Sequence, residues 1–249
     1  MNNPYSSHQW KRNGFTLIEL LVTMAISSVL LITLSAVIIQ TTDSYALSQR
    51  AVNHLSQARA FFQLIESELS TRLPETPLIH RSSITGASLE SDRIAFVRVL
   101  PNDEQNSEFP GDLAIICYYV AFVQEADQRV IPKLFRKILN STETQEFLEA
   151  GESAEFPEVD PTLDEPVIDF VMSFRATPMY LNPETGNDEP WNKTIQLSPS
   201  HLELIIRTTD ESLSRRLTDE EAWNRLTITP KKNDLQMIRT AAHRISIGK

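Results

Sequence analysis

Cysteine and glycine are scarce in this sequence, which contains one cysteine, Cys117, and six glycines. A single cysteine excludes an internal disulfide, so apolar packing must hold the fold together. Cys117 lies within the apolar run 113–123, which predicts a buried small side chain and not a nucleophile. So few glycines leave little material for the loops that bind phosphate groups or dinucleotides.

Catalytic motifs are also missing from the sequence. No two histidines form a helical metal-binding pair, and there is no serine elbow, phosphate loop or dinucleotide fingerprint. We therefore expect no enzymatic activity, no catalytic residue, no resident metal and no cofactor. The histidines are scattered along the chain and are expected to be surface or hydrogen-bonded residues: His8, His54, His80, His201 and His243.

Basic residues are fewer than acidic ones, with 23 Lys and Arg against 33 Asp and Glu and a formal net charge of −10. Two of the basic residues, Lys11 and Arg12, lie in the segment 1–14, which has no apolar periodicity and reads as a leader. Nonspecific binding to nucleic acid requires clustered Lys and Arg. We therefore expect no nucleic-acid partner.

One long apolar run is present, from Phe15 to Ile39, with Glu19 as its single charge. Its length of about 25 residues reaches roughly 37 Å as a helix, enough to cross a bilayer core of about 30 Å. An ordinary secretory signal has a shorter apolar region and is cleaved after it. Here the favourable site for cleavage lies before the apolar run. Lys11 and Arg12 lie just ahead of it, and no Lys or Arg follows until Arg50. The positive-inside rule therefore places the N-terminus in the cytoplasm and residues 40–249 outside it.

Glu19 is an ionisable residue inside the predicted span. A carboxylate there is costly and marks a functional position that needs a partner. If the chain begins at Phe15, its amine is that partner, because it is largely cationic at neutral pH. The two residues are four apart and share a helix face, but the same pair can also form between adjacent subunits. The alternative is that Glu19 only snorkels into the headgroups.

Residues 11–20, KRNGFTLIEL, resemble the class III prepilin signal of type IV pilins and type II secretion pseudopilins. In that family a prepilin peptidase cuts after the glycine and methylates the new terminus. The resemblance implies cleavage after Gly14, N-methylation of Phe15 and an assembly role for Glu19, with Lys11 and Arg12 as leader charges. It also implies a pilin-like fold.

The helix is predicted to continue beyond the span to residue 73. Apolar residues recur at steps of three and four, and Pro74 and Pro77 follow them. No proline interrupts the helix before Pro74, which departs from many pilins. The expected organisation is a leader (1–14), a transmembrane and filament-core helix (15–39), an amphipathic continuation (40–73) and an extracytoplasmic β-rich domain (74–249). The apolar stripe is Val52, Leu55, Ala58, Phe62, Ile65, Leu69 and Leu73.

After Pro74 the pattern changes to strands rich in β-branched and aromatic residues. Pro132 suggests that its strand is at a sheet edge or starts with a turn. A long helix followed by strands predicts an α+β fold, with a mainly antiparallel sheet on the helix stripe. The expected strands are Arg93–Leu100, Leu113–Val123, Val130–Leu139, Val167–Ala176 and His201–Thr208.

Three further segments have specific expectations. The acidic segment 141–169 is compatible with a calcium site, but a solvated loop or helix face is the commoner form of such glutamate spacing. The segment 177–193 is expected to be a loop whose Tyr180 and Trp191 either form a contact surface or cover a core edge. A capping box at Thr218 predicts a short helix to about Leu226 with Trp223 inside. The tail 234–247 is either helix or strand.

The downstream sequence gives a second, weaker resemblance. Residues 62–69, 111–120 and 134–136 are similar to the minor pseudopilin J of type II secretion, and residues 58–62 to the Verru_Chthon cassette protein C group. This implies a minor pseudopilin or minor pilin-like component of a type II secretion or type IV pilus-like filament. Its partners would be prepilin peptidase, other pilin-like subunits and inner-membrane lipid. The alternative is a membrane-anchored binding module that recognises a secreted or surface partner without driving filament assembly.

Overall fold

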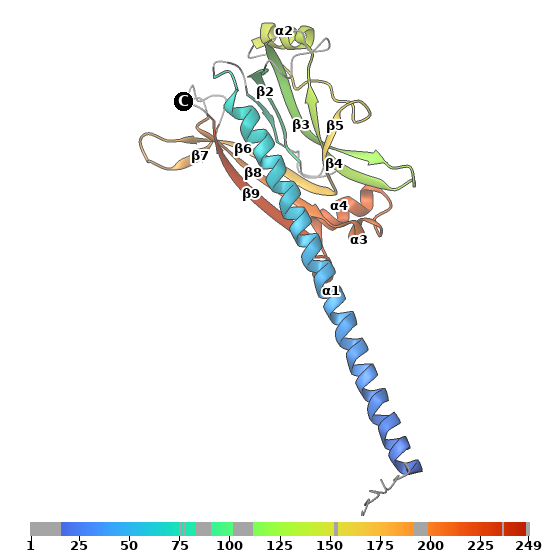
Figure 1. Ribbon diagram of the computed structural model, residues 1–249. Helices are drawn as coiled ribbons and strands as arrows, with labels where there is room; N and C mark the ends of the chain where they lie inside the picture. The colour runs from blue at the N-terminus through green and yellow to red at the C-terminus, as the bar shows by residue number, and fades with distance from the viewer. Residues whose placement is uncertain are drawn as a thin grey trace, which may run out of the picture. The chain divides into compact units, whose positions relative to one another are not determined.

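The computed structural model describes residues 16–74, 76, 78–82, 91–101, 112–151, 154–191, 199–235 and 237–247. It divides into two compact units, residues 1–49 and 50–249. Helix α1, Leu17–Ser70, runs from the first unit into the second (Figure 1). The predicted α+β class with a long N-terminal helix is confirmed, because antiparallel sheets follow α1.

Helix α1 ends three residues before the predicted end at residue 73. After Ser70 the chain pairs with the sheet: the Leu73 N–H donates to the Val97 carbonyl (3.0 Å) and the Val99 N–H donates to the Thr71 carbonyl (3.0 Å). The backbone groups of these residues are therefore satisfied by the sheet instead of by another helical turn. Pairing with a strand, and not Pro74, sets this end of the helix.

The first sheet has the strand order β1-β2-β3-β4-β5, and all its pairs are antiparallel. Three of its strands confirm the predicted strands to within one residue. The strand β1 was not predicted, because three residues are too few for a period-2 pattern. The bounds are β1 Ile79–Arg81, β2 Arg93–Val99, β3 Leu113–Gln124, β4 Val130–Ile138 and β5 Glu165–Asp169.

Pro132 lies inside β4, so the expected edge strand or turn is wrong. β4 has a neighbour on each side, and Pro132 is opposite Phe122 of β3. The ladder between β4 and β5 begins only at Lys133, opposite Asp169. The proline therefore sits where one side of β4 has no ladder partner, which is how a sheet interior tolerates it.

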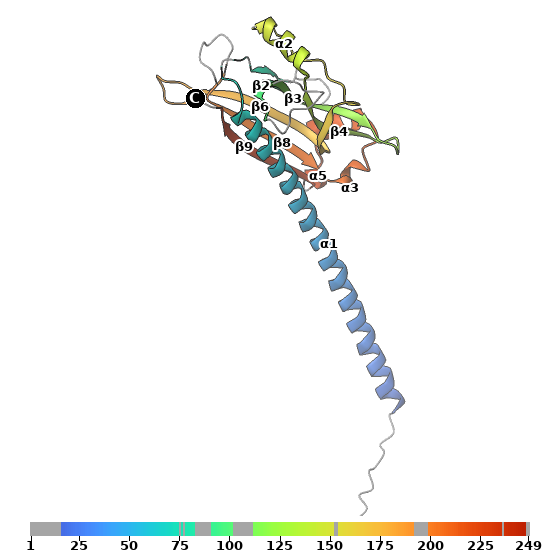
Figure 2. The same ribbon diagram turned by 45° about the horizontal axis from the view of Figure 1, so that its top comes forward.

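The second sheet has the order β7-β6-β8-β9, again with antiparallel pairs (Figure 2). Its strand β8 confirms the strand predicted at 201–208. Its last strand settles the ambiguous tail, which is extended from Ile238 to Ser246 after a short helix. The bounds are β6 Val171–Leu181, β7 Asp188–Pro190, β8 His201–Thr209 and β9 Ile238–Ser246.

The single strand predicted at Val167–Ala176 is wrong, because the chain changes sheets within it. β5 ends at Asp169, and β6 begins at Val171 in the other sheet. Phe170 between them has φ 59°, a left-handed conformation that non-glycine residues rarely adopt. Its carbonyl accepts the Thr209 N–H (3.0 Å). The sequence has no glycine or proline at this break that would have predicted it.

The loop predicted at 177–193 is also largely wrong, because residues up to Leu181 continue β6 and residues 188–190 form β7. Tyr180 is buried, and its hydroxyl donates to Glu189 (2.7 Å) across this hairpin. Trp191 is partly buried and packs against the main core. Trp191 therefore covers a core edge, the second of the two roles considered for these aromatics.

The described part of the second unit also contains four short helices: α2 Ser141–Ala150, α3 Glu211–Ser214, α4 Glu220–Ile228 and α5 Lys232–Leu235. The capping box predicted at Thr218 is wrong. The N-cap of α4 is Asp219, whose carboxylate accepts the Ala222 N–H (2.8 Å). A capping box does occur at α2, where Asn140 and Glu143 cap each other. The prediction that Trp223 lies inside is confirmed.

The core of the second unit has three clusters. The largest lies between α1 and both sheets and includes Phe61, Ile65 and Phe174. A second covers the opposite side of β2 and β3 under α2, and contains Cys117. A third joins Met172 of β6 to Trp223 of α4. Cys117 is fully buried as predicted, and burial raises the pKa of its thiol far above the usual value.

Candidate functional site

The predicted processing site lies outside the described residues. This holds for Lys11, Arg12, Gly14 and Phe15, so cleavage and methylation stay predictions. Glu19 is described, lies in the first turn of α1 and is exposed. The structure therefore presents one member of the predicted assembly pair.

The first turn of α1 shows why a carboxylate is accommodated at Glu19. The Glu19 N–H donates to the Thr16 carbonyl (3.1 Å) and to the Thr16 hydroxyl (3.3 Å), so Thr16 caps the helix start. Unpaired amides at a helix N-terminus carry partial positive charge and favour a nearby carboxylate. A new amine at Phe15 would add a full positive charge to the same end.

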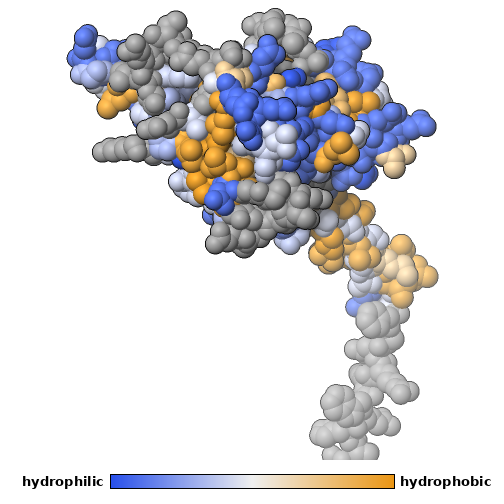
Figure 3. All heavy atoms as spheres, turned by 90° about the horizontal axis from the view of Figure 1, so that it is seen from above, coloured by the Kyte–Doolittle hydropathy of each residue, from blue (hydrophilic) through white to orange (hydrophobic). Residues whose placement is uncertain are grey.

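The apolar part of α1 has no covering within its own unit. Its large apolar side chains between Leu17 and Ile39 are 50% to 80% exposed. Among the described residues, α1 is a helix long and apolar enough to cross a membrane. Figure 3 shows orange, hydrophobic atoms gathered on this part of the chain, whereas hydrophilic atoms cover much of the visible face of the β domain. Lipid or other helices must cover such a surface.

Five hydroxyl groups along α1 are satisfied within the helix. Each donates to a backbone carbonyl three or four residues earlier, at 2.7 to 2.9 Å. A hydroxyl bonded in this way can face an apolar environment without leaving an unpaired donor. The residues are Thr23, Ser28, Thr33, Thr41 and Thr42.

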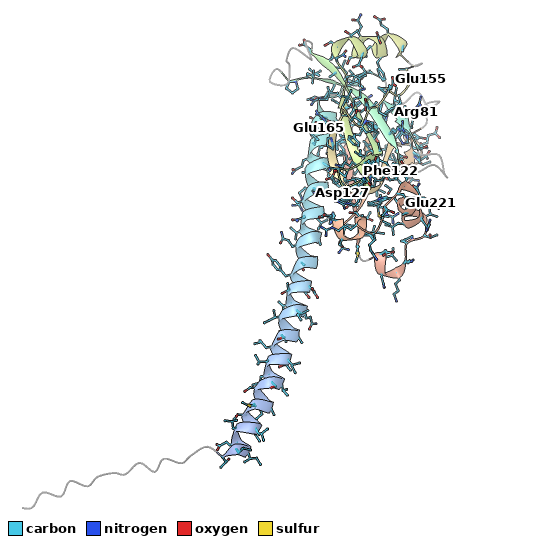
Figure 4. All side chains as sticks on the ribbon, turned by 90° about the vertical axis from the view of Figure 1, so that its right-hand side faces the viewer. Arg81, Phe122, Asp127, Glu155, Glu165 and Glu221 are labelled. Carbon is cyan, nitrogen blue, oxygen red and sulfur yellow. The ribbon has the colours of Figure 1, made fainter. Side chains whose placement is uncertain are left out.

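A buried ionic cluster fixes the last turns of α1 to the first sheet. Glu68 is 1% exposed and accepts from the Tyr118 hydroxyl (2.5 Å) and the Arg136 Nε (2.7 Å). Arg136 also reaches Glu165 of β5 at 3.1 Å, and Glu165 is labelled in Figure 4. The carboxylate of Glu68 is thus paired on both oxygens, which a buried charge requires. We call Glu68, Tyr118 and Arg136 the α1 clamp.

The pKa values of the α1 clamp follow from burial and from pairing. Burial, and then the charge of Glu68, raises the pKa of Tyr118 well above its usual value, so its hydroxyl stays protonated and donates. Burial by itself lowers the pKa of Arg136, but Glu68 and Tyr118 outweigh it and the pKa is raised. Tyr118 is therefore a neutral phenol, and Arg136 a cation, over the whole physiological pH range.

Sequence reasoning missed the α1 clamp because the predicted stripe of α1 was built from apolar residues alone and left out Glu68. A signal was present: Glu68 follows Phe61 by seven residues and Ile65 by three, which places it on the buried stripe. By contrast Val52 and Leu55, predicted for that stripe, are 58% and 54% exposed. The stripe that the sheets cover begins at Ala58.

Four polar residues near the end of β8 have the residue types of a hydrolase but not its geometry. Ser200 Oγ lies 2.9 Å from His201 Nδ1, beside a cavity of about 500 Å³. Asp188 is 3.9 Å from His201 Nε2, too far for a hydrogen bond, and pairs with Arg244 at 2.8 Å. Burial, with the charge of Arg244, lowers the pKa of His201. The Asp188 carboxylate therefore pairs with Arg244 and does not orient the His201 imidazole to act as a base.

Carboxylates of the acidic segment 141–169 bind different partners and do not converge on one point. Glu143 caps α2, Asp164 accepts from the Tyr119 hydroxyl (2.6 Å), and Asp169 pairs with Lys133 (3.3 Å). No group of three or more His, Cys, Asp or Glu able to hold a metal occurs among the described residues. Calcium binding stays an untested expectation.

Comparison with known proteins identifies the N-terminal segment. Residues 11–35 match the family model of the prokaryotic N-terminal methylation motif. No curated protein matches the chain. The matched segment contains Gly14, Phe15 and Glu19, so the resemblance first seen in residues 11–20 extends through most of the apolar run.

Two solved structures are similar in outline. One is the GspK-GspI-GspJ complex of the type 2 secretion system of enterotoxigenic Escherichia coli, at 13% identity, covering 62% of this chain and 88% of that one, with a TM-score of 0.33. The other is a type IV-like pilin from Thermus thermophilus, at 12% identity, covering 77% of this chain and 94% of that one, with a TM-score of 0.42. The family-model match therefore shows a prokaryotic N-terminal methylation motif at the head of the long apolar helix α1.

Proposed function

We propose that the protein is a prepilin-type structural protein, a minor component of a type II secretion or type IV pilus-like filament. The observation that carries this proposal is the methylation motif at residues 11–35, which coincides with the exposed apolar part of α1. Prepilin peptidase cuts after Gly14 and methylates Phe15, and the chain remains in the inner membrane with its β-rich unit on the periplasmic side. Its partners are other pilin-like subunits.

Assembly in this proposal depends on the contact between Glu19 and the Phe15 amine of a neighbouring subunit. Glu19 is exposed, and so are the apolar side chains around it. When helices pack side by side, water is excluded and the attraction between carboxylate and amine strengthens. The pair then fixes the axial position of each subunit, while the apolar surface supplies most of the contact area.

The first experiment is mass spectrometry of the N-terminus of the native protein and of the Gly14→Val variant. We expect an N-methylated Phe15 terminus in the native protein and an unprocessed Met1 terminus in the variant. An unprocessed native protein in a host with active prepilin peptidase would refute this function.

The second experiment tests the assembly contact. Glu19→Gln should be processed normally but fail to enter filaments or crosslinked oligomers, because it has lost the charge that pairs with the amine. Asp43→Asn is the matched control, since Asp43 is an exposed acidic residue on α1 beyond the apolar run. Equal assembly of the two variants would refute the role of Glu19. A processed native protein that never assembles would favour the membrane-anchored binding module.

A further inference from the structure

A cavity of about 500 Å³ lies at one end of the second sheet. It is lined from the end of β6, the start of β7, the start of β8 and the end of β9, and Figure 1 shows the hairpin that joins β6 to β7. Small-ligand sites typically have volumes of about 300 to 1000 Å³. We call this cavity the β8 pocket. Its lining residues are Leu181, Asp188, Ser200, His201, Arg244 and Ser246.

His201 is buried at the β8 pocket although it is not part of the apolar core. It is 4% exposed. The alternation of side chains along β8 places it on the face of the sheet opposite to Leu202 and Leu204, which pack in the largest core cluster. Buried polar groups in folded proteins are normally hydrogen-bonded. Each of the two ring nitrogens of His201 is therefore expected to have a partner.

The Nδ1 atom of His201 has partners that determine the tautomer of the ring. Arg244 Nη2 lies 3.2 Å from Nδ1, and a guanidinium only donates hydrogen bonds, so Nδ1 accepts and carries no proton. Ser200 Oγ lies 2.9 Å from the same atom and can donate to it. Burial and the charge of Arg244 lower the pKa of the imidazole, which is therefore neutral. Its single proton is on Nε2, which makes Nε2 a donor.

The Nε2–H of His201 is a buried donor with no acceptor among the described residues. Oδ2 of Asp188, which also lines the pocket, is 3.9 Å from Nε2, too far for a hydrogen bond. The separation is less than two hydrogen bonds of about 2.8 Å placed end to end, so one oxygen atom can contact both groups. That oxygen must accept a hydrogen bond from Nε2 and donate one to the carboxylate.

Only a hydroxyl group meets both requirements. A carbonyl or an anion can accept from Nε2–H, but it has no proton to donate to Asp188. An ammonium group can donate to Asp188 but cannot accept from Nε2–H. A metal ion would need a lone pair on Nε2, which is protonated. Water has the same hydrogen-bonding capacity as a hydroxyl, so the experiment must distinguish water from a ligand.

The other groups of the β8 pocket suit a neutral ligand with several hydroxyls. Arg244 pairs with Asp188 at 2.8 Å and His201 is neutral, so the lining has no net charge. The guanidinium of Arg244 and the hydroxyl of Ser246 belong to exposed residues and can bind further hydroxyls. Leu181 is 56% exposed and adds an apolar surface against which the carbon atoms of a ring can pack.

We propose that the β8 pocket binds a neutral saccharide, one hydroxyl of which accepts from His201 Nε2–H and donates to Asp188. A neighbouring hydroxyl of the same sugar ring binds Arg244 or Ser246, and the ring packs on Leu181. The inference does not depend on the proposed filament role, because all the lining residues belong to the second unit.

The test uses the full chain in lipid nanodiscs, because maltoside detergents are themselves saccharides. Saturation-transfer NMR measures binding of methyl α-glucoside, methyl α-galactoside and methyl α-mannoside, each offered alone. The main variant is Asp188→Asn. Its matched control is Glu203→Gln, which removes the same charge opposite Arg244 in the β8–β9 pairing but does not line the pocket. Leu181→Lys is a second variant, at an exposed side chain whose replacement should fill the pocket without unfolding the sheet.

We expect at least one glycoside to bind to the unchanged chain and equally to Glu203→Gln. Its affinity should fall about tenfold in Asp188→Asn, which loses a hydrogen bond to a charged group, and binding should be lost in Leu181→Lys. Equal binding to all four chains would overturn the proposal, because the sugar would then bind elsewhere. If none of the three glycosides binds, the pocket holds water only and the proposal is wrong. Binding of inorganic phosphate instead, strengthened by Asp188→Asn, would also overturn it and assign the pocket to an anion.

Discussion

The two parts of α1 differ in how their side chains are covered, although they form one helix without a proline. Between Leu17 and Ile39 the apolar side chains are exposed in every direction, and hydroxyl groups are satisfied by the helix itself. Between Ala58 and Leu69 one stripe is buried against two sheets and contains a paired charge. The first part therefore depends on partners outside the chain, and the second part does not. Variants in the two parts should accordingly differ in what they disturb.

The largest effect on folding is expected for Phe61→Ala. Phe61 is 1% exposed and contacts Tyr118 and Phe174 edge to face at 5.5 and 5.9 Å between ring centroids. Its removal should cost about 3 to 5 kcal/mol of unfolding free energy. Urea unfolding of the full chain in detergent, followed by tryptophan fluorescence, to which buried Trp223 contributes, measures this. Leu30→Ala in the apolar run should leave that transition unchanged, and an equal loss in both variants would break the comparison.

The α1 clamp should give the next largest effect. Glu68→Gln leaves the Arg136 guanidinium with only the exposed carboxylate of Glu165 as its counter-charge, which should cost about 3 kcal/mol. The matched control is Glu66→Gln, because Glu66 is exposed and lies 3.4 Å from His243; its loss should be within about 1 kcal/mol. A double-mutant cycle with Arg136→Met isolates the coupling. Additive losses would show that the two side chains do not act as a pair.

Acidification should weaken the second unit through His201. Burial and Arg244 lower its pKa in the fold, so below about pH 6.5 the unfolded chain binds a proton that the folded chain resists. Stability is therefore full above that pH and falls as pH decreases. His201→Gln should reduce the loss of unfolding free energy between pH 7 and 5. Some slope should remain, because burial also lowers the pKa of His54. An unchanged slope in His201→Gln would assign the acid sensitivity to other groups.

The smallest effect on folding is expected for Val52→Ser combined with Leu55→Ser. Both side chains are more than half exposed, although they continue the buried stripe in sequence. Each change should alter the unfolding free energy by less than about 0.5 kcal/mol. Their effect should appear in crosslinking to other subunits instead. A loss of stability comparable to that of Phe61→Ala would place the boundary between the two parts of α1 nearer to residue 50.

Local signals predicted the elements whose patterns are long and self-contained. The apolar run, the helix to within three residues of its end and four of the strands followed from periodicity, and burial of Cys117 and Trp223 followed from apolar neighbours. The Phe170 break did not follow, because a continuous alternating pattern does not record that its two halves belong to different sheets. The prediction that Pro132 marks an edge strand or a turn was wrong for a related reason. A proline is tolerated inside a sheet where the neighbouring strand has already ended, and the sequence does not show where that is.

The sequence by itself determined the anchor and its methylation motif, because these are properties of consecutive residues that need no folded partner. Only the tertiary structure decided what pairs with Glu68, since its partners Tyr118 and Arg136 come from strands 50 and 68 residues away. A charge in sequence becomes an ion pair, a cap or a free surface according to what the fold brings beside it.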